Sequence, residues 1–342
     1  MFKDTKDEKV KLEEIYLKAN NIFELLEIEK SLEVKEENLY LRALNRLCWK
    51  ESEKSALKVI VDEAQRVYEQ CENVENISIG YMDILRSLSW KQDEEMVLEE
   101  IAEKAAEVYE KNQSFKKIAR HYMGVLSSLS RKQTLDSFMQ DVVAEANRVY
   151  AQNAGSEMIA NEYLIILGNL CEIQEGKFLW EEVAEDARAV YEKHKNYERV
   201  INNYLSFQGK LYMVQKAKSD LEAIVAEIKS VYEENNTAEN VVREYIEVLS
   251  RLFKFEEDES ELKKIEEEGA RVYKKHSASE LIAGEYVTFL FNIIIKGGEE
   301  AKIKEIEELA KSVYEQNKTS ELVVIGYLSI LNVVPWKQEK TT

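Results

Sequence analysis

Residues 139–170 read MQDVVAEANRVYAQNAGSEMIANEYLIILGNL, and this stretch contains the pattern that decides the fold. Its Val149-Tyr150 pair and its second tyrosine, Tyr163, each recur along the chain at an interval of 41 residues. The first ladder comprises Tyr68, Tyr109, Tyr150, Tyr191, Tyr232, Tyr273 and Tyr314, and the second comprises Tyr40, Tyr81, Tyr122, Tyr163, Tyr204, Tyr245, Tyr286 and Tyr327. Fifteen of the 18 tyrosines belong to these ladders, with no insertion or deletion. The chain is therefore predicted to be a stack of equal repeats.

The pattern within each repeat predicts two helices, which we call helix A and helix B. Residue positions in a repeat are counted from the tyrosine of the Val-Tyr pair, which is position zero. Apolar residues at −11, −8, −4, −1 and 0 form one stripe at helical spacing, which predicts helix A from about −14 to +2. Asparagine or histidine often follows at +3, where asparagine tolerates the left-handed backbone that commonly ends a helix. A serine or threonine beside an acid then marks a new helix start.

Helix B is predicted from a wider apolar stripe, at +9, +13, +14, +16, +17 and +20, and we expect it to be the more buried helix of each pair. Mostly small residues stand at −4 on helix A, and at +18 on helix B of the middle repeats. Small residues let two helices approach closely, so both positions predict close helix crossings.

The composition supports a helical solenoid. Proline occurs once, at Pro335, and glycine only 11 times in 342 residues, so the main helix breakers are scarce. A chain of this length exceeds the usual size of a single hydrophobic core. A solenoid is not limited in this way, because each repeat packs only on its neighbours. We predict a single all-α domain over residues 1–342, a right-handed α-solenoid of eight antiparallel helix pairs. The repeats are approximately 1–52, 53–93, 94–134, 135–175, 176–216, 217–257, 258–298 and 299–342.

The terminal repeats differ from the others. In repeat 1 Glu27 replaces the ladder tyrosine among many charges, which is typical of a capping repeat. Repeat 8 stops where another helix A should begin, and Ile325 and Val333 stand at mostly polar positions, followed by Trp336. Uncovered apolar surface usually marks an interface, so we expect the C-terminal repeats to self-associate or meet a partner, unless the chain is a piece of a longer one.

Charge and cysteine content indicate which partners are disfavoured and in which compartment the protein is expected. Acidic residues outnumber basic ones by 66 to 47, a formal net charge of −19, which disfavours binding to nucleic acid or to an anionic membrane. Cys48, Cys71 and Cys171 are an odd set without paired spacing, which is typical of a reducing compartment. No segment has the 18 or more apolar residues that span a bilayer, and the N-terminus is too charged for a signal peptide. We expect a cytoplasmic protein.

No motif for catalysis, phosphate binding or metal binding is found. The chain has no His-Glu-x-x-His or Cys-x-x-Cys spacing, no glycine-rich phosphate loop and no nucleophile elbow. His194 and His276 occupy the +3 position that asparagine takes elsewhere, which favours a helix-ending role. His121 is predicted to be solvated or to line a groove. We therefore expect neither an enzyme nor a cofactor or metal site.

The paired helices, the tyrosine in helix B and the small residues at helix crossings resemble the tetratricopeptide repeat class of α-solenoids. The resemblance covers nearly the whole chain but concerns architecture, because the usual unit has about 34 residues and a regular proline that is missing here. A HEAT-like unit is closer in length and ranks second. Resemblance to the tetratricopeptide class implies a protein-interaction scaffold whose concave face holds a peptide or partner helix. It implies no catalytic residues.

Candidate binding residues lie on helix B where the repeats differ. Asparagine and arginine can hold a peptide backbone or a carboxylate through directional hydrogen bonds. The two polar rows are Arg120, Asn161, Asn202 and Arg243 at +11, and Asn169, Lys210, Arg251 and Asn292 at +19. Ordinary exposed surface is the alternative, and the pattern leaves open whether helix A or helix B lines the concave side. The tyrosine ladders are interpreted as packing rather than as an aromatic binding track, because core positions must repeat.

Together these features predict a non-enzymatic scaffold that binds a protein or peptide in a solenoid groove. One alternative is a regulatory sensor, in which a peptide or small ligand changes the pitch of the superhelix. Another is the recognition subunit of an enzyme complex whose catalytic subunit is a separate chain.

Overall fold

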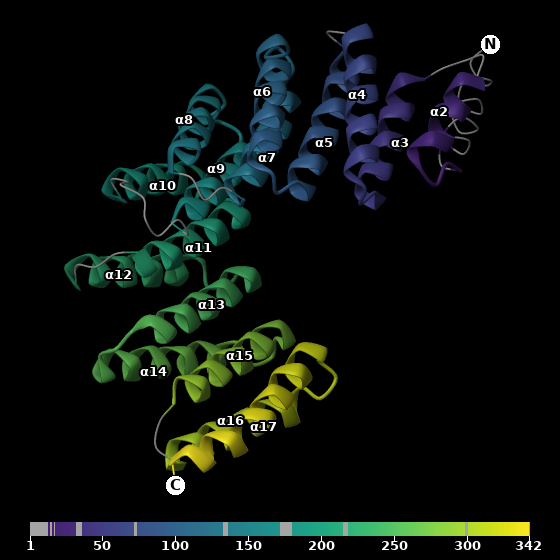
Figure 1. Ribbon diagram of the computed structural model, residues 1–342. Helices are drawn as coiled ribbons and strands as arrows, with labels where there is room; N and C mark the ends of the chain where they lie inside the picture. Colours follow the sequence, from purple (N-terminus) through teal and green to yellow (C-terminus); the bar gives the residue numbers. More distant parts are fainter. Residues whose placement is uncertain are drawn as a thin grey trace, which may run out of the picture. The chain divides into compact units, whose positions relative to one another are not determined.

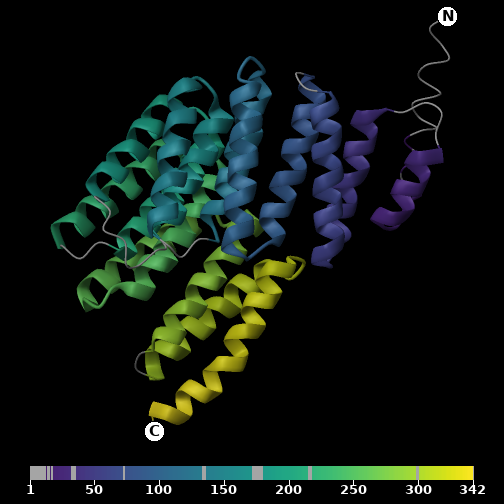
Figure 2. The same cartoon turned by 45° about the horizontal axis from the view of Figure 1, so that its top comes forward.

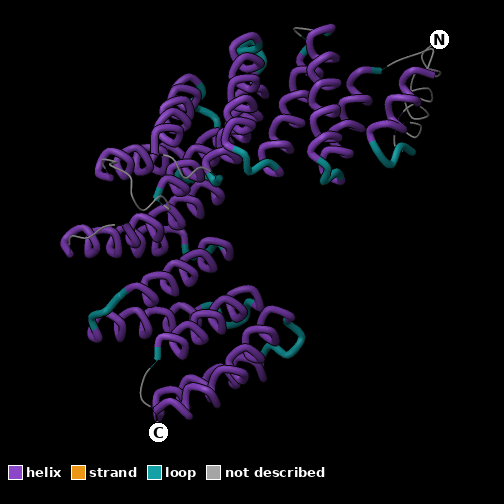
Figure 3. The backbone as a smooth tube through the Cα atoms, in the orientation of Figure 1, coloured by secondary structure: helices purple, strands orange, loops and turns teal. Residues whose placement is uncertain are grey.

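The computed structural model describes residues 13, 16, 18–31, 36–71, 74–132, 136–171, 180–214, 218–297 and 300–341. Over these ranges the chain forms sixteen α-helices and no strand (Figures 1 and 3). The helices are α2 (Ile22–Ser31), α3 (Glu37–Lys50), α4 (Lys54–Gln70), α5 (Glu75–Lys91), α6 (Glu95–Lys111), α7 (Lys116–Ser130), α8 (Asp136–Gln152), α9 (Glu157–Leu170), α10 (Trp180–His194), α11 (Glu198–Val214), α12 (Lys218–Asn235), α13 (Glu239–Phe255), α14 (Glu259–Lys275), α15 (Glu280–Lys296), α16 (Glu300–Gln316) and α17 (Glu321–Thr341).

Even-numbered helices are the predicted helices A, and odd-numbered helices are the predicted helices B. Each helix A packs on the helix B that follows it, as the yellow pair α16 and α17 shows in Figure 2. The prediction of an all-α solenoid is confirmed. The helices fall into two compact units, an N-terminal unit of residues 1–170 (α2–α9) and a C-terminal unit of residues 171–342 (α10–α17).

Helix A ends where the sequence predicts, but for a different reason. At the end of α6, Asn112 has φ −124° and ψ 23°, which is not the left-handed conformation. Its side chain acts instead, because Nδ2 donates to the Val108 carbonyl at 2.8 Å and so satisfies one of the last carbonyls of the helix. The same bond recurs from Asn235 to Val231 and from Asn317 to Val313.

The two tyrosine ladders meet inside each of the seven hairpins from α4–α5 to α16–α17. The ring at position 0 of helix A stacks on the ring at +13 of helix B, with centroids between 4.1 Å (Tyr232 and Tyr245) and 5.2 Å (Tyr150 and Tyr163) apart. Offset stacking of this kind adds to the free energy of burial. The ladder tyrosines of helix B from Tyr40 to Tyr286 are buried, so the interpretation of the ladders as packing is confirmed.

In four of the described junctions the hydroxyl at +13 also bonds one repeat to the next. This hydroxyl donates to a glutamate five residues before the ladder tyrosine of the following helix A, and the pairs are Tyr40 with Glu63, Tyr122 with Glu145, Tyr204 with Glu227, and Tyr245 with Glu268, at 2.9–3.0 Å. A lysine at the end of helix B donates in turn to the last carbonyls of the preceding helix B, as Lys91, Lys132 and Lys296 do. These bonds hold neighbouring repeats in one register.

The small residues occupy close contacts, as predicted. A Cβ on Gly269, at −4 of α14, would stand 2.3 Å from the Phe289 ring of α15. A Cβ on Gly209, at +18 of α11, would stand 3.2 Å from the Val248 side chain of α13. Position −4 therefore fits helix A to its own helix B, whereas +18 fits helix B to the next helix B.

We predict that Tyr163→Ala lowers the free energy of unfolding by about 3–5 kcal/mol, the usual loss for a large aromatic side chain removed from a core. Tyr163 is 1% exposed and stacks on Tyr150. Tyr197, which lies outside both ladders and is 47% exposed, is the matched control, and Tyr197→Ala should cost at most about 0.5 kcal/mol. Urea unfolding followed by circular dichroism measures both, and equal losses for the two variants would contradict the structural role.

Candidate functional site

The predicted binding residues lie on the closely spaced row of helices. Within the N-terminal unit α3 contacts α5, α5 contacts α7 and α7 contacts α9, and within the C-terminal unit α11, α13, α15 and α17 contact one another in the same succession. Among the helices A of either unit, the described residues bring only α2 and α4 as close together. A stack whose members are closer on one side curves toward that side. Helices B therefore line the inner side of each unit (Figure 1).

The +11 row follows this inner side. Arg120 of α7 is exposed, whereas Asn161 of α9, Asn202 of α11 and Arg243 of α13 are partly buried. The row therefore has one exposed member and three partly buried members.

The +19 row bonds neighbouring helices B to each other. Asn169 Nδ2 donates to Ser130 Oγ at 2.8 Å, and Asn292 Nδ2 donates to Ser250 Oγ at 2.6 Å. Arg251 reaches Ser206 of α11 at 3.3 Å and pairs with Glu247 on its own helix. Lys210 of α11 is partly buried. The bonds of Asn169, Arg251 and Asn292 join consecutive repeats.

Three consecutive inner helices of the C-terminal unit carry a group of polar side chains, which we call the Glu244 cluster. It comprises Asn202 and Ser206 on α11, Arg243, Glu244, Glu247 and Arg251 on α13, and Glu285 on α15. Glu244 is the most buried of its charged members, with 7% of its surface exposed, and Arg243 Nη2 lies 3.9 Å from its Oε2.

Burial sets the protonation of the two inward-facing acids. It raises the pKa of the Glu244 carboxyl from its ordinary 4.5 to about 7, and the negative charge of Glu247 adds to this rise. The positive charges of Arg251 and Arg243 and a hydrogen bond from Ser206 oppose it. Burial and Glu247 also raise the pKa of Glu285, against the same two arginines.

The cluster has hydrogen-bonding capacity that the described residues do not use. Asn202 Oδ1, Arg243 Nε and Glu244 Oε1 are buried and have no hydrogen-bond partner among them. Buried polar atoms are nearly always paired, so two acceptors and one donor in the same cluster identify a polar site rather than ordinary packing.

Sequence reasoning found Asn202, Arg243 and Arg251 but missed Glu244, Glu247 and Glu285. Glutamate is among the residues most often exposed, so a glutamate beside the ladder tyrosine is predicted to be ordinary surface. The available signal was position +12, which carries Glu162, Asn203, Glu244 and Glu285 in four successive repeats next to a buried tyrosine.

The inner side of the N-terminal unit carries a smaller polar set. His121 Nδ1 lies 2.6 Å from Asp83 Oδ1, which joins α7 to α5. The Arg86 guanidinium passes over Gly124 of α7, where a Cβ would stand 2.9 Å from it, and Arg86 Nη2 lies 3.9 Å from Glu162 Oε1 on α9. His121 therefore lines the inner side, one of its two predicted placements.

The predicted C-terminal interface lies on α17. Ile325 is 54% exposed, as is Leu328, and Leu322 is also exposed, whereas Val333 is partly buried. The Trp336 side chain lies outside the described residues. Other repeats bury the residue equivalent to Leu328, such as Ile246 and Val287, because the next repeat covers it.

Neither a metal site nor a membrane-spanning helix is found among the described residues. Within these ranges no three histidine, cysteine, aspartate or glutamate side chains converge into a set that could ligate a metal ion. No helix that the structure describes combines the length and apolar character needed to cross a bilayer.

The fold thus defines the chain as an α-solenoid of helical hairpins. No protein-family model and no curated protein matches its sequence. Its class is therefore established by the repeated hairpin itself.

We predict that Glu244→Gln stabilises the protein at high pH. The carboxyl titrates near 4.5 in the unfolded chain and near 7 in the folded one, so the folded state holds this proton more tightly. The free energy of unfolding therefore falls by roughly 3 kcal/mol as the pH rises from the lower of these pKa values to the higher, since one pKa unit is worth about 1.4 kcal/mol.

The variant should match the parent near pH 4.5 and exceed it at pH 8, as measured by urea unfolding at both pH values. Glu233→Gln, at an exposed position of α12, is the control and should show no such difference. A stability gain that is the same at both pH values would contradict burial of the charge as the cause.

Proposed function

We propose that this chain is a non-enzymatic, tetratricopeptide-like scaffold of the cytoplasm that binds a protein or peptide along the inner side of its helices B. The Glu244 cluster carries the proposal. Its three unpaired buried atoms mark a polar site. Its partly exposed side chains Arg243, Glu247 and Arg251 offer the donors and acceptors that a peptide backbone or a polar side chain satisfies.

The direction of binding follows from the arrangement of the cluster. Its members come from α11, α13 and α15, so a bound segment would cross these helices and contact one row of residues per repeat. Position +15 places Ser206, Glu247 and the exposed Thr288 along this course. Solenoids with such extended inner surfaces bind partners over several repeats, which yields specificity from many modest contacts.

We expect a photo-crosslinker on the inner side to capture a partner in cells of the native host. Thr288 and Arg120 are exposed inner-side positions, and Glu267 of α14 and Glu103 of α6 are exposed positions on helices A of the same repeats. Benzoylphenylalanine at Thr288 or Arg120 should form a discrete adduct at several-fold higher yield than at Glu267 or Glu103. Equal yields on both sides, or no adduct on the inner side, would overturn the proposal.

A second role, self-association, is favoured by the exposed apolar residues of α17. We propose that Ile325 and Leu328 contact a second copy of the chain, because the equivalent residues of α15, Gly284 and Val287, lie against the following helix α17.

The double variant Ile325→Glu, Leu328→Glu should then shift a dimer to monomer in light scattering across micromolar concentrations. Val225→Glu, at a partly exposed apolar position of α12, is the control and should leave the dimer unchanged. A parent protein that is monomeric throughout this range would exclude self-association.

A further inference from the structure

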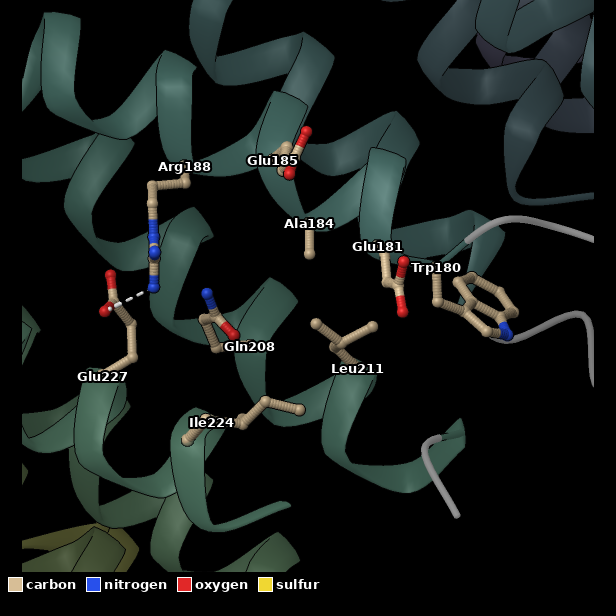
Figure 4. A pocket seen from close by; sticks show the side chains of 10 residues that line it. Trp180, Glu181, Ala184, Glu185, Arg188, Gln208, Leu211, Ile224 and Glu227 are labelled. Atoms are coloured by element: carbon tan, nitrogen blue, oxygen red, sulfur yellow. Dashed lines mark hydrogen bonds and ion pairs between the residues drawn. The ribbon is translucent and has the colours of Figure 1, made fainter. Parts of the chain in front are cut away.

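Two grooves lie on the side of the helices A, because these helices are farther apart than the helices B beneath them. One groove, of about 270 Å³, lies between α4 and α6 with α5 as its floor. The other, of about 280 Å³, lies between α10 and α12 with α11 as its floor (Figure 4). We call them the α5 groove and the α11 groove. Their floors use the same repeat positions, Leu85 and Leu88 in one and Gln208 and Leu211 in the other.

The grooves share their geometry but differ in charge. The α5 groove is balanced, with three lysines and three acids, which are Lys54, Lys58, Lys104, Asp62, Glu94 and Glu100. The α11 groove has three acids, Glu181, Glu185 and Glu227, and one base, Arg188. Arg188 Nη2 pairs with Glu227 Oε2 at 2.8 Å, so among the described residues that line the groove the exposed Glu181 and Glu185 are the acids without an ion pair.

Gln208 marks the α11 groove as a departure from the repeat. Position +17 is leucine in the other seven repeats, at Leu44, Leu85, Leu126, Leu167, Leu249, Leu290 and Leu331. Gln208 is only 4% exposed, and its Nε2 donates to the Tyr204 hydroxyl at 2.7 Å. No described residue donates to its Oε1, which leaves a carbonyl acceptor at the floor of the groove.

The walls around this acceptor are mostly apolar. Figure 4 shows Gln208 between Arg188 and Leu211, with Ile224 on one wall and Ala184 on the other. The Trp180 indole borders the end of the groove that is remote from the Arg188 and Glu227 pair. A ligand that fills this groove needs an aliphatic stem, hydrogen-bond donors and a positive charge.

We propose that the α11 groove binds an arginine side chain presented by a partner protein. The aliphatic stem of arginine suits Leu211, Ile224 and Ala184, and its guanidinium carries donors only, which suits Gln208 Oε1 and the Glu181 and Glu185 carboxylates. The planar guanidinium also stacks on aromatic rings such as that of Trp180. The groove volume of about 280 Å³ lies at the lower end of the roughly 300–1,000 Å³ range of small-ligand sites and has room for one long side chain.

This site is separate from the inner side and does not depend on the function proposed there. The charge of the α11 groove favours a cationic ligand, because three of the four charged residues that line it are acids and only one of these acids is paired with Arg188. The α5 groove provides an internal comparison, with a similar volume, a leucine floor and no excess of acid.

The test uses the full chain and two short peptides, acetyl-Gly-Ser-Arg-Ser-Gly-amide and the same peptide with citrulline, which has the shape of arginine without its charge. Binding is followed by peptide-observed NMR and by Trp180 fluorescence in a protein whose Trp49, Trp90 and Trp336 are phenylalanine. We expect millimolar affinity for the arginine peptide and about tenfold weaker binding of the citrulline peptide, because a charge-assisted bond is lost.

Variants of the lining residues test whether the arginine peptide binds in the α11 groove. Gln208→Leu introduces the residue of the other repeats, so the fold should be retained, as circular dichroism will check, and arginine binding should fall about tenfold. Glu181→Gln combined with Glu185→Gln should weaken it comparably, whereas Glu100→Gln in the α5 groove should not. Equal binding of both peptides, an unchanged affinity in Gln208→Leu, or no binding of the arginine peptide at millimolar concentrations would each overturn the proposal.

Discussion

The rest of the structure depends on the stacked pair of tyrosines inside seven of the helical hairpins, α4–α5 to α16–α17. The ring at position 0 is near the end of helix A, and the ring at +13 is in the middle of helix B, so their contact sets how far helix B slides along helix A. The hydroxyl at +13 then reaches the next helix A in four described junctions. An inserted residue would move one ring or one hydroxyl off its partner. This requirement explains why the interval of 41 residues is kept without a single insertion.

The unequal spacing of the two rows follows from which residues face each junction. Glycines and serines on helix B, such as Gly209 and Ser250, let successive helices B approach closely. The helices A have no such mutual contact in most of the described repeats, and each packs instead on the helices B below it. Within each unit the helices B therefore form a closely packed inner side, while the helices A leave grooves between them. Both candidate sites result from this difference, one on each side of the stack.

The sequence predicted the helices and their burial well, because both depend on local periodicity that eight repeats confirm many times over. It did not predict which row is inner, since that depends on the relative spacing of helices far apart in the chain. It also placed Asn169 and Asn292 in a binding row, although both donate to serines of the preceding repeat. A repeated polar residue looks the same in sequence whether it faces a partner or a neighbouring helix. Gln208 differs from these two asparagines, because the sequence already shows it as an exception among seven leucines at the same repeat position. Only the structure shows that it lies at the floor of a groove.

The junction between helices A distinguishes the two grooves further. In repeats 2, 4 and 7 the glutamate that accepts from a tyrosine is also held by an arginine three residues later, Arg66, Arg148 or Arg271. Ser230 occupies that position beside Glu227, and Arg188 of α10 supplies the missing cation across the groove.

Glu227 is thus bonded to Tyr204 from the floor and to Arg188 from the opposite wall. The α5 groove is spanned by Lys54 and Glu94, whose side chains are both more than half exposed, and an exposed pair of this kind contributes little rigidity. In that groove Lys104 stands where Glu227 stands in the other, and the Tyr81 hydroxyl has no partner among the described residues. Arg188 is also more than half exposed, so the difference lies in Glu227, which is mostly buried and is held by Tyr204 as well. A wall residue that is already held loses less entropy on binding, which favours the α11 groove over its counterpart as a site for a single side chain.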